Sequence, residues 1–172
     1  MKNLRMYLTT ALMLAIGLIM HSFVPGTLGA MKFDFTLGFI FIAFFLYPNK
    51  ENAIAVGIAG GLLTALTTTF PGGQLPNIID KIVTVFVLYL LYKLTEKIMN
   101  KKIQVIFLSF IGTIVSGIVF LGSALVITGL PAPFTALFLM VVLPTAIGNI
   151  PLTFIVYTAA NRAKNQINPQ KC

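Results

Sequence analysis

The sequence predicts an all-α integral membrane protein with six transmembrane helices, and three observations lead to this fold class. Of the 172 residues, 58% are hydrophobic. Only 9% are charged, whereas a soluble domain carries about 25% charged residues. The apolar residues also lie in runs that end at clusters of Pro, Gly or charged residues. Lipid is therefore a better solvent than water for most of the surface that this chain exposes.

The first predicted helix covers residues 4–24. A basic start and an apolar stretch give it the look of a signal peptide, but the sequence TLGA puts Leu28 where a cleavage site needs a small residue. We therefore expect a retained helix. It carries Ala11 and Ala15 four residues apart, a spacing that permits the close approach of a second helix. These two alanines are the candidates for a partner interface.

The other five helices, which complete a single transmembrane domain over residues 1–172, are expected near residues 33–47, 53–70, 78–95, 103–128 and 134–160. A helix needs about 20 residues to cross hydrocarbon, so the short second helix either begins earlier or packs inside the bundle. Pro144 and Pro151 are expected to kink the last helix. The small-residue pairs Gly57/Gly61 and Gly112/Ser116 predict packing between helices of the bundle.

The distribution of basic residues predicts the orientation in the membrane. Six spans place both termini on one side, and all but Lys32 and Lys81 of the twelve Lys and Arg residues fall on that side. The positive-inside rule then puts both termini in the cytoplasm and the chain in the plasma membrane. Topology also explains the net charge of +8, so nucleic-acid binding is not required.

The unusual polar residues collect on the outer side, above all in residues 67–81, TTTFPGGQLPNIIDK. A charge at the centre of a bilayer costs about 2.5–3.5 kcal/mol, so such residues usually face water, a cavity or a ligand. An apolar, aromatic-lined pocket with a few polar groups is typical of a small-molecule site, and these residue types suit a zwitterion with a planar ring. The candidate substrate-binding residues are Lys32, Asp34, Phe70, Gln74, Asn77, Asp80, Lys81 and Asn149.

Structural interpretations of the same residues stay open. Asn77 and Asp80 could cap a helix. Lys32 and Asp34 could form an ordinary surface pair, and Lys81 could extend to the membrane interface.

The remaining polar residues do not indicate an enzyme. Asn149, between two prolines, could satisfy kinked backbone or a neighbouring helix, and His21 is expected as a lone polar residue at a helix end. The single His and the single Cys, Cys172, lie far apart in the sequence and cannot build a metal or Cys–His site. The sequence contains no P-loop. We therefore expect neither enzymatic activity nor a cofactor or metal.

Three stretches carry a resemblance to a known family: GAMKFDFTLGFIFI, LLTALTTTFPGGQLPNIIDKI and IGTIVSGIVFLGSALVITGLP. Through them the chain resembles the bacterial tryptophan transporter family TrpP over nearly its whole length. This family is similar to the substrate-binding S components of energy-coupling factor (ECF) transporters, six-helix proteins with cytoplasmic termini and an outward-side cavity. The resemblance thus implies an S-component-like bundle that takes up L-tryptophan.

The resemblance also implies partners. In S components an Ala-x-x-x-Ala patch on the first helix meets the coupling subunit, and Ala11 and Ala15 match this pattern. An ECF-type coupling subunit and its ATPases are candidate partners besides the lipid bilayer. The sequence contains no Trp, which suits a protein made during tryptophan scarcity. Two alternatives remain: an S component for a vitamin or another aromatic metabolite, and a membrane adaptor subunit that does not transport.

Overall fold

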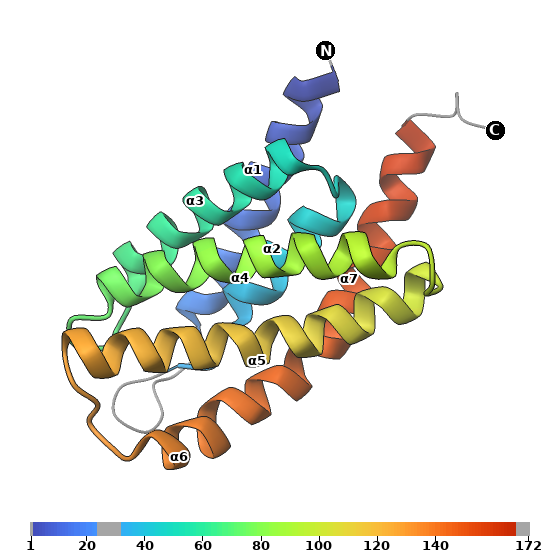
Figure 1. Cartoon of the computed structure of the whole chain (residues 1–172). Helices are drawn as coiled ribbons and strands as arrows, with labels where there is room; N and C mark the ends of the chain where they lie inside the picture. The colour runs from blue at the N-terminus through green and yellow to red at the C-terminus, as the bar shows by residue number, and fades with distance from the viewer. Residues whose placement is uncertain (1, 24–31, 168–172) are drawn as a thin grey trace.

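The computed structural model describes residues 2–23 and 32–167, and these residues form helices and connecting loops without a strand (Figure 1). In chain order the elements are α1 (Lys2–Ser22), α2 (Phe35–Leu46), α3 (Lys50–Thr67), α4 (Gln74–Thr95), α5 (Lys101–Ile127), α6 (Phe134–Leu137), the π-helical turn η2 (Phe138–Val142) and α7 (Leu143–Ile167).

Helix α2 forms the centre of the bundle. It carries no charged residue, and residues 36–46 are all buried, as expected for a helix that is apolar on every side. Asp34 caps its start by accepting the Leu37 N–H at 3.0 Å, and Pro48 prevents its continuation. Twelve residues span about 18 Å, less than the ~30 Å of hydrocarbon. The expected alternative that this helix packs inside the bundle is therefore confirmed.

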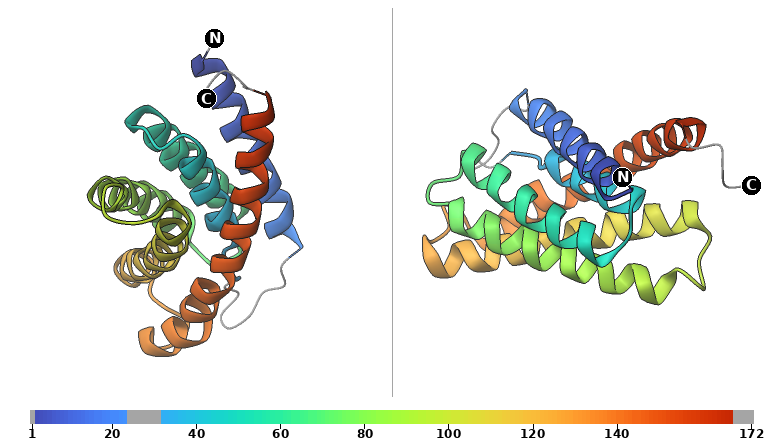
Figure 2. Two further views of the ribbon diagram at one scale, coloured as in Figure 1. Left: turned by 90° about the vertical axis from the view of Figure 1, so that its right-hand side faces the viewer. Right: turned by 90° about the horizontal axis from the view of Figure 1, so that it is seen from above.

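Three helical segments are long and apolar enough to cross a membrane: Leu4–Ser22, Lys101–Ile127 and Phe134–Gln166. The shorter α2 is apolar as well. The start of α1 and the end of α7 lie on the same side of the bundle in both Figure 1 and Figure 2. The protein is thus an all-helical, multi-pass membrane protein.

Helix α4 begins earlier than the sequence suggests. We expected it to start at Ile78, with Asn77 and Asp80 as its cap, but it starts at Gln74 and is preceded by Gly73. Pro76 does not stop it, because the first-turn N–H groups of a helix have no partner within the helix. The Asn77 side chain instead donates to the Gly73 carbonyl at 2.8 Å. The capping interpretation is therefore wrong.

The last helical segment changes direction along its length (Figure 1). In the π-helical turn the Leu143 N–H bonds to the Phe138 carbonyl, five residues earlier. Pro144 follows directly, and since it has no N–H it cannot bond to the carbonyl four residues before it. The π-turn shifts the hydrogen-bond register at this break. Pro151 lies inside α7.

Small residues set the closest contacts between helices. A Cβ on Gly61 would stand 3.3 Å from the Ile78 Cα, and one on Gly112 would stand 2.7 Å from the Phe41 ring. Both pairs predicted for packing within the bundle thus lie at helix contacts, which confirms that prediction. Ala11 and Ala15 differ, because both are exposed on the outer face of α1.

Two glycines of α5 give a matched test of this packing. A Cβ on Gly117 would lie 2.2 Å from Val142 Cγ1, while one on Gly122 would meet nothing within 4 Å. We expect Gly117→Ala to lower the free energy of unfolding by about 1–3 kcal/mol, since it overpacks the contact. Gly122→Ala should instead raise it by roughly 0.5–1 kcal/mol through helix propensity. Thermal unfolding of both purified variants in one detergent measures the difference, and equal effects would contradict this packing.

Candidate substrate-binding site

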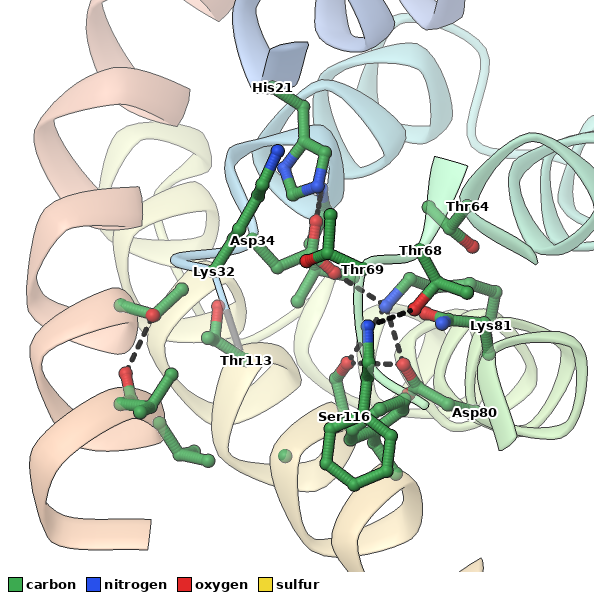
Figure 3. A pocket seen from close by; sticks show the side chains of 18 residues that line it. His21, Lys32, Asp34, Thr64, Thr68, Thr69, Asp80, Lys81, Thr113 and Ser116 are labelled. Carbon is green, nitrogen blue, oxygen red and sulfur yellow. Dashed lines mark hydrogen bonds and ion pairs between the residues drawn. The ribbon is translucent and has the colours of Figure 1, made fainter. Parts of the chain in front are cut away.

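A cavity of about 90 Å³ lies at the end of the bundle where α1 and α3 end and where α2 and α4 begin (Figure 3). The second half of α5, η2 and the start of α7 complete its wall. The structure therefore brings together segments that are far apart in the sequence. Six of the eight predicted substrate-binding residues line this cavity: Lys32, Asp34, Phe70, Asn77, Asp80 and Lys81.

A buried group of three charged side chains forms one side of the cavity. Lys81 Nζ lies 2.6 Å from Asp34 Oδ2 and 2.5 Å from Asp80 Oδ2, and Figure 3 shows it between the two carboxylates. The Lys81 side chain is only 2% exposed, so it does not extend to the membrane interface. Asp34 forms its ion pair with Lys81. Lys32 and Asp34 therefore do not form the surface pair considered above. Both structural alternatives for these lysines are thus wrong, because a buried charge needs a partner of opposite sign.

The two carboxylates differ in how accessible they are. Asp80 is fully buried. Besides its ion pair, it accepts hydrogen bonds from the Thr84 hydroxyl at 2.8 Å and the Ser116 hydroxyl at 2.9 Å. The Asp34 side chain keeps 26% of its surface exposed and lines the cavity. Asp34 is therefore the more accessible of the two carboxylates. Lys32 is half-buried and lines the same space.

The loop between α3 and α4, residues 68–73, forms one wall. The Phe70 N–H bonds to the Thr68 hydroxyl at 3.2 Å, and the Gly73 N–H bonds to the Phe70 carbonyl at 2.9 Å. Gly72 has φ +68°, and a Cβ there would stand 2.4 Å from Thr128 Cγ2 at the end of α5. Only glycine combines this left-handed conformation with such close contact. The Gly-rich sequence therefore fixes this wall against α5.

An aromatic face lies beside the charges. Phe70 and Phe120 meet edge to face, with ring centroids 5.4 Å apart, and Val141 and Val142 belong to the same apolar cluster. The sequence analysis identified Phe70 but named no residue of α5. Thr113, Ser116 and Phe120 all line the cavity. Their spacing of three and four residues, on one face of a helix, is the signal that could have found them.

Two predicted residues lie outside the cavity wall. Gln74 is exposed in the first turn of α4, because that helix starts earlier than expected. Asn149 is fully buried, and its amide donates to the Asp34 carbonyl at 3.2 Å and to the Thr113 hydroxyl at 3.3 Å. Gln74 and Asn149, which were also predicted to bind substrate, therefore do not line this cavity with the other six residues. Asn149 joins neighbouring helices, as its structural alternative proposed.

The cavity offers charged and aromatic groups for binding a ligand. Within residues 2–23 and 32–167, no three His, Cys, Asp or Glu residues gather as a metal site. One accessible carboxylate, one accessible ammonium and an aromatic face suit an aromatic zwitterion. A cavity of about 150 Å³ holds benzene, so this smaller cavity must widen before it admits a bicyclic ring.

Comparison with known proteins agrees with this chemistry. Residues 3–164 match the family described as "Tryptophan transporter TrpP". The chain belongs to this family.

Three relatives carry the name "Probable tryptophan transport protein". The one from Bacillus subtilis is 48% identical over 147 residues, covering 86% of this chain and 85% of its own. The Clostridium acetobutylicum protein is 44% identical over 161 residues, 94% of each chain. The Clostridium perfringens protein is 38% identical over 170 residues, 94% and 93% of the two chains. No solved structure matches the chain. The part that matches TrpP includes the whole cavity wall.

Proposed function

We propose that the protein takes up L-tryptophan into the cell through this cavity. Membership of the TrpP family and the names of the three relatives support this function. The structural observation that carries it is the placement of Asp34 and Lys32 as the accessible charges beside the Phe70–Phe120 face. Neither a vitamin carrier nor a membrane adaptor explains this combination as directly.

The charges of the cavity suit a zwitterion. Two lysines and two aspartates line it, and the ligand adds one charge of each sign. The ligand ammonium binds Asp34, and its carboxylate binds Lys32. Lys81 then remains with Asp80. Each of the six charges then has a partner of opposite sign. This matters because an unpaired charge in a low-dielectric environment is unfavourable in free energy.

The ring of the ligand lies on the aromatic face. Edge or offset contacts with Phe70 and Phe120 stabilise an indole there. A buried indole N–H needs an acceptor, and Asn77 lines the cavity. The Asn77 amide N–H donates to Gly73, so its side-chain oxygen remains for the indole. Gln74 lies outside the wall and has no role in this arrangement.

In this proposal the chain passes through the plasma membrane six times: the short α2 makes its pass inside the bundle, covered by the other helices, and α6, η2 and α7 together make the last pass. Both chain ends then lie in the cytoplasm, as the basic residues indicate, and the cavity opens outward. The exposed Ala11 and Ala15 support α1 as the surface for an ECF-type coupling subunit, as in S components. Normal uptake in cells that lack the ECF ATPases would rule out this partner without affecting the binding site.

Competition experiments test the ligand class. We expect unlabelled L-tryptophan to block uptake of radiolabelled tryptophan, whereas tryptamine and indole-3-propionate, which each lack one charge, should compete at least about 30-fold more weakly. That factor corresponds to ~2 kcal/mol, the low end of the loss for a buried charge pair left incomplete. A vitamin that competes better than tryptophan would support the vitamin carrier, and normal tryptophan uptake in a deletion strain would support the adaptor.

A further inference from the structure

A second hollow lies on the surface of the bundle, between α5 and α7. The two helices are joined where the Asn149 amide donates to the Thr113 hydroxyl at 3.3 Å. From this contact they diverge toward the start of α5 and the end of α7 (Figure 1). The hollow, here called the α5–α7 groove, lies on the diverging side and has a volume of about 430 Å³. It is lined by six apolar residues: Met99, Ile103, Ile106, Phe107, Phe110 and Ile150.

The α5–α7 groove lies at the depth of one membrane leaflet. Its α5 wall runs from Ile103, in the first turn of the helix, to Phe110, a rise of about 10 Å. Half of the hydrocarbon core is about 15 Å thick. Helix α5 begins on the cytoplasmic side in the proposed orientation, so the groove faces the acyl chains of the cytoplasmic leaflet.

Basic side chains lie at the cytoplasmic end of the groove. Lys102 is exposed and lies one turn before Ile106, on the same face of α5. Its ammonium forms no ion pair within residues 2–23 and 32–167. Lys97, in the loop that leads into α5, is exposed as well. Lys101 differs, because its ammonium bonds to the Tyr92 hydroxyl and lies 4.6 Å from the centre of that ring. Lys102 therefore offers a positive charge beside an apolar groove.

We propose that the α5–α7 groove binds an anionic phospholipid of the cytoplasmic leaflet. One acyl chain lies along the apolar side chains, and the headgroup phosphate pairs with Lys102. Basic pockets between transmembrane helices on the cytoplasmic side commonly bind such headgroups. A zwitterionic lipid fills the apolar part equally well, but its headgroup carries its own ammonium and gains less from Lys102. The lipid site shares no lining residue with the substrate cavity.

The absence of Trp from the chain permits a direct test, because a single introduced Trp reports only its own surroundings. Phe107→Trp places an indole in the groove. Phe86→Trp is the matched control, since Phe86 is 61% exposed on α4 and lies outside the groove. Each variant is reconstituted in vesicles of phosphatidylcholine and phosphatidylglycerol, with bromine on the acyl chains of one lipid or of the other. A brominated chain in contact with the indole quenches its emission, so the two quenching efficiencies give the relative affinity for the two lipids.

The groove should select the anionic lipid. We expect phosphatidylglycerol to be preferred about fivefold at residue 107, which corresponds to ~1 kcal/mol for one lysine near the membrane surface. At residue 86 the two lipids should quench about equally, because no basic residue is free beside a groove there: the nearby Lys93 pairs with Glu96 at 3.2 Å.

Two charge variants in the Phe107→Trp protein test the role of the headgroup. Lys102→Ala should lower the preference to about twofold or less, since the phosphate loses its counter-charge. Lys50→Ala should leave it unchanged. It removes the same charge from the same side of the membrane, but Lys50 is exposed at the start of α3, outside the groove.

Three results would overturn the inference: equal affinity for the two lipids at residue 107, a preference that survives Lys102→Ala, or no quenching at residue 107 by either lipid. The last result would mean that protein covers the groove. None of these measurements uses tryptophan as a ligand, so their failure would leave the proposed function intact, and a failure of tryptophan binding would leave the lipid site intact.

Discussion

Replacing Lys81 with methionine is expected to abolish tryptophan uptake and to lower the free energy of unfolding by about 3–5 kcal/mol. Methionine fills similar space but leaves Asp34 and Asp80 without their shared counter-charge. Lys81 Nζ lies within 2.6 Å of both carboxylates, and Asp80 is fully buried. Two carboxylates without a cation repel each other and have lost their hydration. Thermal unfolding in detergent and uptake of labelled tryptophan measure the two effects.

Lys93→Met is the matched control for this experiment. Lys93 lies in the same helix and pairs with Glu96 at 3.2 Å, but both side chains are substantially exposed, so its loss should cost less than about 1 kcal/mol. The double variant Asp80→Asn/Lys81→Met should recover part of the lost stability, because it removes one of the two unpaired charges. Equal unfolding temperatures for Lys81→Met and Lys93→Met would show that the three charges do not form the buried group described above.

Replacing Asp34 with asparagine should weaken tryptophan binding at least about 30-fold, or ~2 kcal/mol, because the ligand ammonium loses its ion pair. The fold should be much less affected. An asparagine oxygen can still accept the Leu37 N–H that caps α2, and Lys81 keeps its ion pair with Asp80. The stability loss should therefore be clearly smaller than that of Lys81→Met. Isothermal titration calorimetry on the folded variant measures the affinity.

Gln74→Ala serves as the control for Asp34→Asn, since Gln74 is exposed and lies outside the cavity wall. It should bind tryptophan with unchanged affinity. If Asp34→Asn binds as tightly as Gln74→Ala does, Asp34 does not receive the ammonium, and the proposed orientation of the ligand is wrong.

The fold class and most of the predicted cavity-lining residues could be read from the sequence, because charged residues stand out in a chain that is otherwise apolar. A Lys or Asp in an apolar chain needs a compensating partner or a ligand, and Lys32, Asp34, Asp80 and Lys81 all reach the same cavity. The pairing of these charges was not predictable. Lys81 lies next to Asp80 in the chain, but its contact with Asp34 spans 47 residues and depends on how α2 packs against α4.

The errors came from local features that tertiary packing or backbone chemistry overrode. Pro76 and the neighbouring glycines suggested a loop up to Asn77. A proline fits the first turn of a helix, however, so α4 starts at Gln74 and the Gln74 side chain is exposed. Asn149 stood out as a polar residue between prolines, but its partners are on α5 and before α2. The α5 residues Thr113 and Ser116 were missed because hydroxyl side chains are common in membrane helices.

The absence of Trp from the chain permits a direct test of ligand capture, because any indole fluorescence then comes from the ligand. L-tryptophan titrated into the purified protein should show a blue-shifted emission that saturates at one ligand per chain, as the indole leaves water for the Phe70–Phe120 face. Emission that stays identical to that of tryptophan in water, at any protein concentration, would contradict the binding of tryptophan in this cavity.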